Sequence, residues 1–235
     1  MWAIEGLDRA VTATLVRELG LHEVTASVLG RRGYADPEEA RRFLDAELPG
    51  HDPFLLGAME DAVGTVRKAI AAERRICVHG DYDVDGICAT ALAVLCLRGL
   101  GAEVGWHLPS RFEEGYGLSG AALQRIAEEG YGLVLTVDCG ITAADEVDEA
   151  RALGLQVIVT DHHRPGERLP SCPVVATRPS DYPFPELCGT GVVYKLAQAL
   201  GAPDLDRHLD LVALATIADV VPLVDENRVL AIAGL

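Results

Sequence analysis

Five aspartates and three histidines lie directly after three short apolar segments of the 235-residue sequence. They are His79, Asp81, Asp83 and Asp85 after residues 76–78, Asp138 after residues 133–137, and Asp161, His162 and His163 after residues 156–160. Carboxylates gathered without compensation repel one another and raise one another's pKa values. Carboxylate oxygens mixed with imidazole nitrogens suit Mn²⁺, and also Mg²⁺ when water completes its coordination. The pattern therefore predicts a pair of divalent ions of the kind that promotes phosphoester hydrolysis.

Asp219 is a further candidate ligand, because it lies within the otherwise apolar residues 214–223. A carboxylate buried without a partner in such a segment is costly, and metal ligation would compensate that cost. A surface position at a helix end is the alternative for Asp219. The other acids also have plain alternatives, which are a turn or helix cap for residues 81–85 and a solvated corner for residues 161–163. Their occurrence at three successive strand ends favours one shared site.

The elements that must position these residues are indicated by the hydrophobic pattern, in which helical periodicity alternates with short apolar runs from about residue 59 onward. The expected helices cover residues 60–74, 86–100, 118–129, 143–153, 189–200 and 205–221, and the expected strands cover residues 76–78, 104–108, 133–137, 156–160 and 174–175. This alternation predicts an α/β fold, a parallel sheet flanked by helices on both faces. Ligands of such sheets bind beyond the carboxyl ends of the strands, where the acids and histidines fall. The proline-rich residues 164–185 are expected to form a surface excursion.

The sequence pattern divides the chain into three parts. Residues 1–58 are expected to be a small helical N-terminal segment, in which Asp36 caps a helix with Pro37 at its first position. Residues 59–225 are expected to be the metal-dependent catalytic domain. Residues 226–235 indicate the start of a helix that leads to a C-terminal domain absent from the sequence, so we expect the chain to be a fragment.

Composition limits the environment and the partners of the chain. The six cysteines are scattered without a close CxxC pair, which argues against a zinc knuckle or a disulfide framework. Neither a membrane-length apolar run nor a signal-peptide pattern is present, so a cytoplasmic protein is expected. The net charge of −16 opposes contact with nucleic acid over most of the surface. Two bound divalent ions would offset about four of these charges.

The chemistry-bearing segments resemble, in the same order, the motifs of the DHH phosphoesterase family. They are HGDYDVDG at residues 79–86, VDCG at 137–140, TDHH at 160–163 and ATIADVVPL at 215–223. The form of the first motif is most similar to the RecJ-like branch of the family. Three further segments resemble that branch: HDPFLL at residues 51–56, RFEEGYGLS at 111–119 and CGTGVVYKL at 188–196. The resemblance extends over nearly the whole chain, and four ordered motifs are highly specific together.

The resemblance implies two metal sites that share the bridging residue Asp138. One site would use His79, Asp83 and Asp138, and the other Asp85, Asp138, His162 and Asp219, with Asp81 as a further ligand or as an acceptor behind the ligands. His163 would stabilise charge near the scissile phosphate or help to protonate the leaving group. Arg111 matches a position expected to touch substrate phosphate. Gly189 and Gly191 precede a helix N-terminus that could bind a phosphate, although an ordinary turn is an equal alternative.

The implied function is metal-dependent phosphodiester hydrolysis with two Mn²⁺ or Mg²⁺ ions. The RecJ-like branch implies a 5′-to-3′ exonuclease that acts on single-stranded DNA in repair or recombination, with repair proteins as possible partners. An oligoribonuclease or cyclic-dinucleotide phosphodiesterase of the same family is the first alternative. A non-catalytic scaffold of a replication complex is the second, and the complete set of expected ligands argues against it.

Overall fold

The computed structural model describes residues 8–47, 50–110, 115 and 117–235. The chain forms two compact units, Met1–Pro49 and Gly50–Leu235. Arg111, which was predicted to touch substrate phosphate, lies outside the described residues. In the part of the chain that the structure describes, every helix is too short or too polar to cross a membrane.

The described part of the first unit is helical, as predicted. Its helices are α1 (Arg9–Leu19), α2 (Glu23–Arg31) and α3 (Pro37–Asp45). The Asp36 carboxylate accepts hydrogen bonds from the backbone N–H groups of Glu38 (2.9 Å) and Glu39 (3.0 Å), and Pro37 occupies the first turn. The predicted helix start at Asp36 is therefore confirmed. Small and aliphatic side chains, including Leu15, form the core of the unit.

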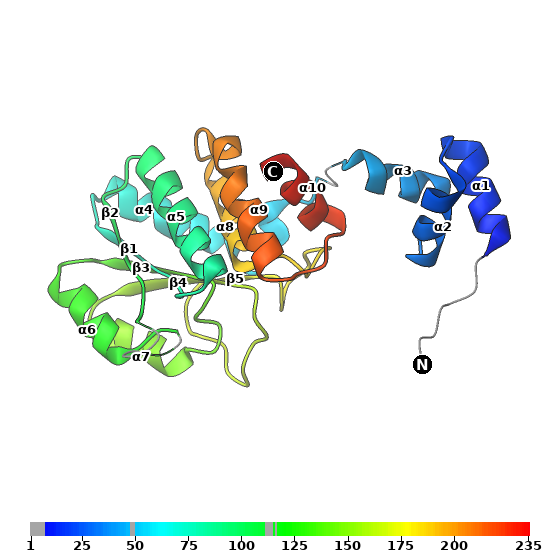
Figure 1. Ribbon diagram of the computed structural model, residues 1–235. Helices are drawn as coiled ribbons and strands as arrows, with labels where there is room; N and C mark the ends of the chain where they lie inside the picture. The colour runs from blue at the N-terminus through cyan, green and yellow to red at the C-terminus, as the bar shows by residue number, and fades with distance from the viewer. Residues whose placement is uncertain (1–7, 48–49, 111–114, 116) are drawn as a thin grey trace. The chain divides into compact units, whose positions relative to one another are not determined.

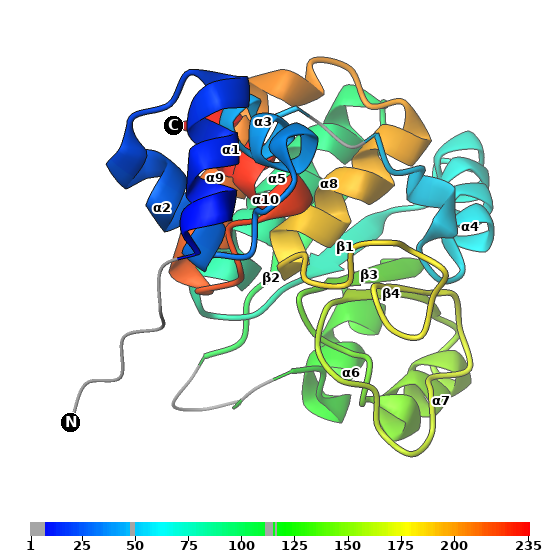
Figure 2. The ribbon, with the colours of Figure 1, turned by 90° about the vertical axis from the view of Figure 1, so that its right-hand side faces the viewer.

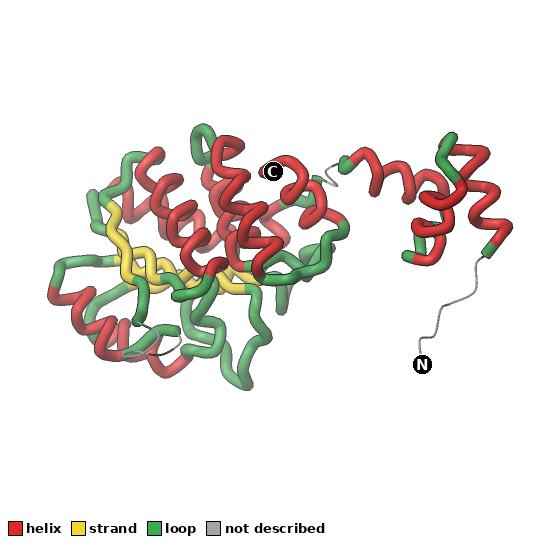
Figure 3. The backbone as a smooth tube through the Cα atoms, viewed as in Figure 1, coloured by secondary structure: helices red, strands yellow, loops and turns green. Residues whose placement is uncertain are grey.

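A five-stranded sheet forms the centre of the second unit, in the strand order β2-β1-β3-β4-β5 (Figures 1 and 3). The strands are β1 (Ile76–His79), β2 (Val104–His107), β3 (Leu133–Val137), β4 (Gln156–Asp161) and β5 (Val174–Ala176). Every pairing is parallel, which confirms the predicted α/β fold. The carboxyl ends of all the strands therefore meet at one edge of the sheet.

Helices cover both faces of this sheet (Figures 1 and 2). One face carries α6 (Gly120–Glu128) and α7 (Ala144–Ala152), and the other side of the sheet holds α4 (Met59–Ala71), α5 (Val84–Gly99), α8 (Gly189–Leu200), α9 (Leu209–Ala218) and α10 (Asp225–Gly234). Alternate strand residues enter different cores. Val78 joins the core that includes α5 and α8 residues, whereas Cys77 joins the core that includes α6 and α7 residues. Because both faces are buried, the strands are apolar along most of their length.

Most expected boundaries lie within three residues of the observed ones, and two discrepancies are more substantial. The expected helix at 205–221 is a 3₁₀ turn, Leu205–His208, followed by α9, which ends at Ala218. It ends there because Val220 adopts a left-handed conformation with φ 58°, which interrupts helical hydrogen bonding. The predicted N-terminal part, residues 1–58, also extends too far. Leu56 is fully buried in the core of the second unit, and the Ala58 N–H donates to the Val174 carbonyl at 2.9 Å.

Candidate metal centre

The carboxyl ends of β1, β3 and β4 bring the predicted acids and histidines together. These strands are adjacent in the sheet. The structure forms three groups in which one ligand atom from each residue lies within 4.8 Å of the others: Asp85, His162 and Asp219; Asp81, Asp83 and Asp138; and Asp138, His162 and His163. Seven residues that the sequence singled out thus converge on one place, including Asp219 from the end of α9.

His162 lies at the centre of the first group. Its Nε2 atom is 3.2 Å from Asp138 Oδ1, 3.8 Å from Asp85 Oδ2 and 3.8 Å from Asp219 Oδ2. These four residues are the set that the sequence assigned to one of the two metal sites. Three carboxylates that surround one imidazole nitrogen form a donor set that Mn²⁺ and Mg²⁺ accept.

The second group differs in one residue from the set predicted for the other site. Asp83 and Asp138 are brought together as expected, and Asp81 completes the group where the sequence had suggested His79. His79 is fully buried beside it at the end of β1, with its Nδ1 atom 3.9 Å from Cys139 Sγ. Ligation by His79 stays a prediction.

Asp138 occupies an unusual backbone conformation at the end of β3. Its φ angle is 61°, its side chain is buried, and its N–H donates to the Thr160 carbonyl of β4 at 3.0 Å. Few residues other than glycine adopt this left-handed conformation, and aspartate is among those that tolerate it. Such local strain is common where a side chain must be aimed at a site. Asp138 belongs to two of the three groups, which makes it the residue best placed for a bridging role.

The N-terminus of α8 is bound to a carboxylate of the chain itself. Asp85 accepts hydrogen bonds from the N–H groups of Gly189 (2.6 Å) and Thr190 (2.8 Å) and from the Thr190 hydroxyl (2.6 Å). A Cβ atom on Gly189 would lie 2.4 Å from Asp138 Oδ1, so only glycine fits there. The predicted contact of Gly189 and Gly191 with substrate phosphate stays untested. The geometry gives Gly189 another role, which is to let two carboxylates approach α8.

Asp161 was counted among the strand-end acids in the sequence, but the family resemblance gave it no role in either metal site. It is fully buried, and its Oδ1 atom accepts hydrogen bonds from the His162 and His163 N–H groups and from the His163 ring at 2.8 Å. Its Oδ2 atom accepts from the Ile141 N–H at 2.9 Å. Asp161 therefore holds the loop and the His163 ring in place. The sequence signal for this residue was its position as the first member of the Asp161-His162-His163 triplet.

The electrostatics of the cluster favour a bound cation. Burial raises the pKa of Asp138 to about 7, and it also raises the pKa values of Asp81 and Asp219. For His162, burial lowers the pKa, but the hydrogen bond and charge of Asp138 and the charges of Asp85 and Asp219 outweigh it, so the pKa rises to about 9. The raised pKa values of these carboxyl groups indicate that the protein's own groups do not fully neutralise their charge. The donor types and the charge excess both fit divalent ions.

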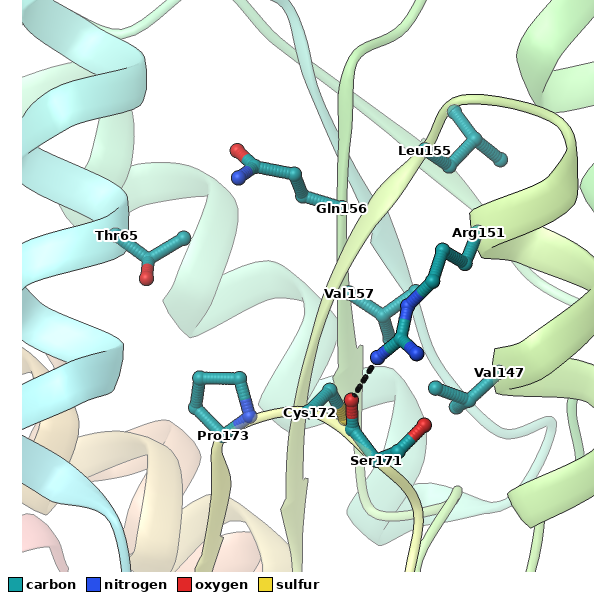
Figure 4. Close-up of a pocket in the computed structure, with 9 residues that line it drawn as sticks. All are labelled: Thr65, Val147, Arg151, Leu155, Gln156, Val157, Ser171, Cys172 and Pro173. Carbon is teal, nitrogen blue, oxygen red and sulfur yellow. Dashed lines mark hydrogen bonds between the residues drawn. The ribbon is translucent and has the colours of Figure 1, made fainter.

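A separate cavity of about 310 Å³ lies at the opposite edge of the sheet (Figure 4). Leu155, Gln156 and Val157, at the amino end of β4, contribute to its wall, and the Arg151 guanidinium donates to the Ser171 carbonyl. Figure 4 shows aliphatic and neutral polar side chains around it, together with the guanidinium group of Arg151. Its lining contains no carboxylate or imidazole among the described residues, so it does not share the chemistry of the metal centre.

Comparison with known proteins agrees with this architecture. Residues 75–216 match the N-terminal domain of the DHH family. The chain therefore belongs to the DHH family.

Its relatives within the family are exonucleases named RecJ. The single-stranded-DNA-specific exonuclease RecJ of Bacillus subtilis (strain 168) is 42% identical over 240 residues, which cover 100% of this chain and 30% of the relative. The same-named protein of Escherichia coli (strain K12) is 39% identical over 223 residues, which cover 87% of this chain and 38% of the relative. The structure of RecJ from Thermus thermophilus in complex with Mn²⁺ is similar with a TM-score of 0.84 and 33% identity, over 99% of this chain and 34% of that one. The chain thus spans about a third of the length of these relatives.

Proposed function

We propose that the chain is a two-metal phosphodiesterase that uses Mn²⁺ or Mg²⁺ and that, within its whole protein, it removes nucleotides from the 5′ end of single-stranded DNA. The position of the His162 ring among the carboxylates of Asp85, Asp138 and Asp219 carries this proposal. The named activity of the RecJ relatives supports the substrate, and the RecJ structures in complex with Mn²⁺ and with Mg²⁺ support the metals.

In this proposal, one ion is held by Asp85, Asp138, His162 and Asp219. The other is held by Asp83 and Asp138 with His79 or Asp81. Bound divalent ions lower the pKa of water and neutralise charge on the transferred phosphoryl group. The residues of the chain keep the two sites at a fixed spacing, because Asp138 contributes to both and the N-terminus of α8 anchors Asp85.

His163 has the geometry of a charge-stabilising residue beside the metals. The hydrogen bond from its ring to Asp161 raises the pKa of His163, although burial opposes this effect. The cationic ring is therefore favoured more than in a free imidazole, and it would stabilise negative charge on a phosphate oxygen or protonate the leaving group. Arg111 would bind a neighbouring phosphate, in keeping with the motif that contains it.

The substrate and the biological role belong to the same proposal. Single-stranded DNA is favoured by the RecJ relatives, and a role in cytoplasmic DNA repair or recombination, together with repair proteins, follows from that choice. The net charge of −16 predicts that the chain by itself holds DNA weakly and mainly through the metal centre.

The test is Mn²⁺-dependent degradation of single-stranded DNA labelled at either end, with Asp138→Ala as the inactive control. Stepwise release from the 5′ end that is absent in the variant supports the proposal. Faster hydrolysis of short RNA or cyclic dinucleotides than of DNA would instead favour the alternative substrates in the family. Calorimetric Mn²⁺ binding without hydrolysis of any of these substrates would contradict an enzyme and favour the scaffold.

A further inference from the structure

A second cavity, of about 800 Å³, adjoins the metal centre on the β4–β5 side of the same sheet edge. We call it the arginine–proline pocket, after Arg164 and Arg178 and the prolines Pro165, Pro179 and Pro185 that line it. The proposed metal chemistry does not require these residues. The pocket is therefore a separate feature of this edge of the sheet.

The topology explains why this pocket opens beside the metals. Arg178 follows the end of β5, and β5 pairs with β4, which ends at Asp161. The pocket and the metal centre also share two side chains, His162 and His163. A ligand with a phosphate at these histidines would thus extend its attached group directly into the pocket.

The walls combine flat apolar surfaces with cationic groups. Three proline rings, Leu187 and Val221 supply apolar surface, the two arginines supply the cations, and Glu186 is the one carboxylate in the lining. Small-molecule sites are commonly clefts of about 300–1,000 Å³ with mainly apolar walls and a few oriented polar groups. A nucleoside next to a phosphate matches this lining, because its base offers a flat apolar face and its phosphate offers an anion.

Of the two arginines that line the pocket, Arg178 is the one with an ion pair to a loop that is itself fixed by a buried hydrogen bond. Its guanidinium pairs with Glu186, and both side chains are 43% exposed, so the pair is worth little by itself. The Glu186 carbonyl accepts a hydrogen bond from Nδ2 of the fully buried Asn227 at 2.6 Å, which fixes the loop that carries Glu186. Because guanidinium has five N–H donors, Arg178 can keep Glu186 and still bind a phosphate oxygen. Among the described residues, Arg164 has no carboxylate within 4.0 Å.

We propose that the arginine–proline pocket binds the nucleoside attached to the scissile phosphate, with its base against the proline rings and Arg178 donating to the phosphate on the other side of that nucleoside. This inference rests on the proposed phosphodiesterase function and deepens it. It makes Arg178 an affinity determinant for nucleotide substrates, whereas the metal residues act on any phosphodiester.

The test compares two small chromogenic diesters in the presence of Mn²⁺. Bis(p-nitrophenyl) phosphate has no nucleoside, and the 5′- and 3′-p-nitrophenyl esters of thymidine 3′,5′-bisphosphate each carry a nucleoside and a second phosphate. Arg178→Ala should raise KM about tenfold for at least one thymidine ester with kcat nearly unchanged, and should leave bis(p-nitrophenyl) phosphate unaffected. Arg178→Lys should recover part of the loss, because it restores the charge but not the forked geometry. Arg207→Ala, at an exposed ion pair elsewhere, is the matched control.

Each outcome decides the proposal. A selective loss on one thymidine ester supports it and identifies the side of the phosphate that the pocket binds. Equal losses on all esters, or no loss on any, overturn it, because Arg178 would then act through the metals or not at all. If the wild-type chain hydrolyses none of the esters, the proposed function fails, and calorimetric titration with thymidine 3′,5′-bisphosphate decides the pocket. Binding weakened by Arg178→Ala would sustain the pocket, and equal or absent binding would overturn it.

Discussion

Lys195 and Glu226 are as deeply buried as Asp138, but their charges meet within the protein. The Lys195 ammonium pairs with the Glu226 carboxylate and also donates to the His51 carbonyl at 3.4 Å. The Tyr182 hydroxyl donates a further hydrogen bond to the Glu226 carboxylate. This cluster joins α8, α10 and the chain that precedes α4. The metal centre contains the opposite balance, with carboxylates in excess over imidazoles and with a raised pKa at Asp138.

The contrast separates two uses of buried charge. A pair that is neutralised within the fold holds elements together, and removal of one partner leaves a costly unpaired charge. A cluster with unneutralised acids costs stability in the absence of a cation, and such costs are common at functional sites. The charge balance of a buried cluster, more than its burial, therefore distinguishes a binding site from a structural network. Substitutions at the two clusters test this distinction, and the largest effect is expected at Asp138.

Asp138→Asn should reduce Mn²⁺-dependent hydrolysis by about a thousandfold or more, because both proposed sites lose a carboxylate. The same variant should stabilise the metal-free protein by roughly 1–3 kcal/mol at a pH above 7, because a buried charge disappears while the side chain keeps its size. Hydrolysis assays with Mn²⁺ and urea unfolding in a chelator measure the two effects. A metal-free variant that is less stable than the wild type would contradict the idea that the centre is strained by its own charge.

Glu226→Ala should act in the opposite direction and destabilise the second unit by about 3–5 kcal/mol, because Lys195 keeps its charge in a buried position. Urea unfolding of the metal-free protein measures this loss. The control is Glu103→Ala, which breaks the exposed pair with Arg75 and should cost no more than about 1 kcal/mol. Mn²⁺ affinity of the folded Glu226→Ala protein should stay near that of the wild type. A loss of Mn²⁺ affinity as large as that of Asp138→Asn would mean that metal binding depends on both clusters, and it would contradict the distinction between them.

Gly189→Ala and Gly191→Ala form a matched pair on the first turn of α8. A methyl group on Gly189 would meet Asp138 Oδ1 at 2.4 Å, whereas one on Gly191 would meet Leu187 Cβ at 3.3 Å. We expect Gly189→Ala to lower hydrolysis about a hundredfold through displaced carboxylates, and Gly191→Ala to stay within a few-fold of the wild type. Similar losses in both variants, with Mn²⁺ affinity retained, would instead favour the predicted phosphate contact at this helix N-terminus.

The pH dependence of stability should reveal the charge excess directly. In the metal-free fold the pKa of Asp138 rises from 3.8 to about 7 and that of His162 rises from 6.5 to about 9. The folded protein therefore binds more protons than the unfolded chain between about pH 4 and pH 9, so the contribution of these groups to the free energy of unfolding falls as pH rises through that range. Mn²⁺ competes with the same protons, so its stabilisation should grow with pH.

Thermal unfolding at about pH 5 and pH 8, with chelator and with saturating Mn²⁺, checks this prediction. The increase in Tm caused by Mn²⁺ should be larger at the higher pH. Asp138→Asn is the control, because it removes one of the two titrating groups and should flatten the dependence measured in chelator. A wild-type protein whose metal-free Tm falls across this range no more steeply than that of the variant would be inconsistent with a charge-strained centre.

The sequence was sufficient for the strands and for the acids at their ends, because both are marked by local patterns. Apolar runs as short as residues 133–137, alternating with helical segments, favour covered strands, and a parallel sheet brings the residues after each strand to one edge. The pairing of Asp85 with the N-terminus of α8 depends instead on packing between residues 104 positions apart. The Lys195–Glu226 pair and the Arg178 pocket also required tertiary structure, since no local pattern marks their partners. The end of α9 depended on the left-handed Val220, which sequence periodicity does not indicate.

Asp161 also tests the contrast between the two clusters, because it is a buried acid of the metal centre whose oxygens are satisfied by hydrogen bonds from the protein. It accepts hydrogen bonds from three backbone N–H groups and from the His163 ring, and these bonds outweigh its burial and lower its pKa. By the argument from charge balance, Asp161 positions His163 and does not bind metal. Asp161→Asn should therefore lower kcat about tenfold and leave Mn²⁺ affinity nearly unchanged. Loss of the carboxylate charge should also lower the pKa of His163, so activity that depends on the cationic ring should decline at a lower pH than in the wild type. Calorimetry with Mn²⁺ and a pH–rate profile separate the two effects, and a large loss of Mn²⁺ affinity with an unshifted profile would place Asp161 among the ligands instead.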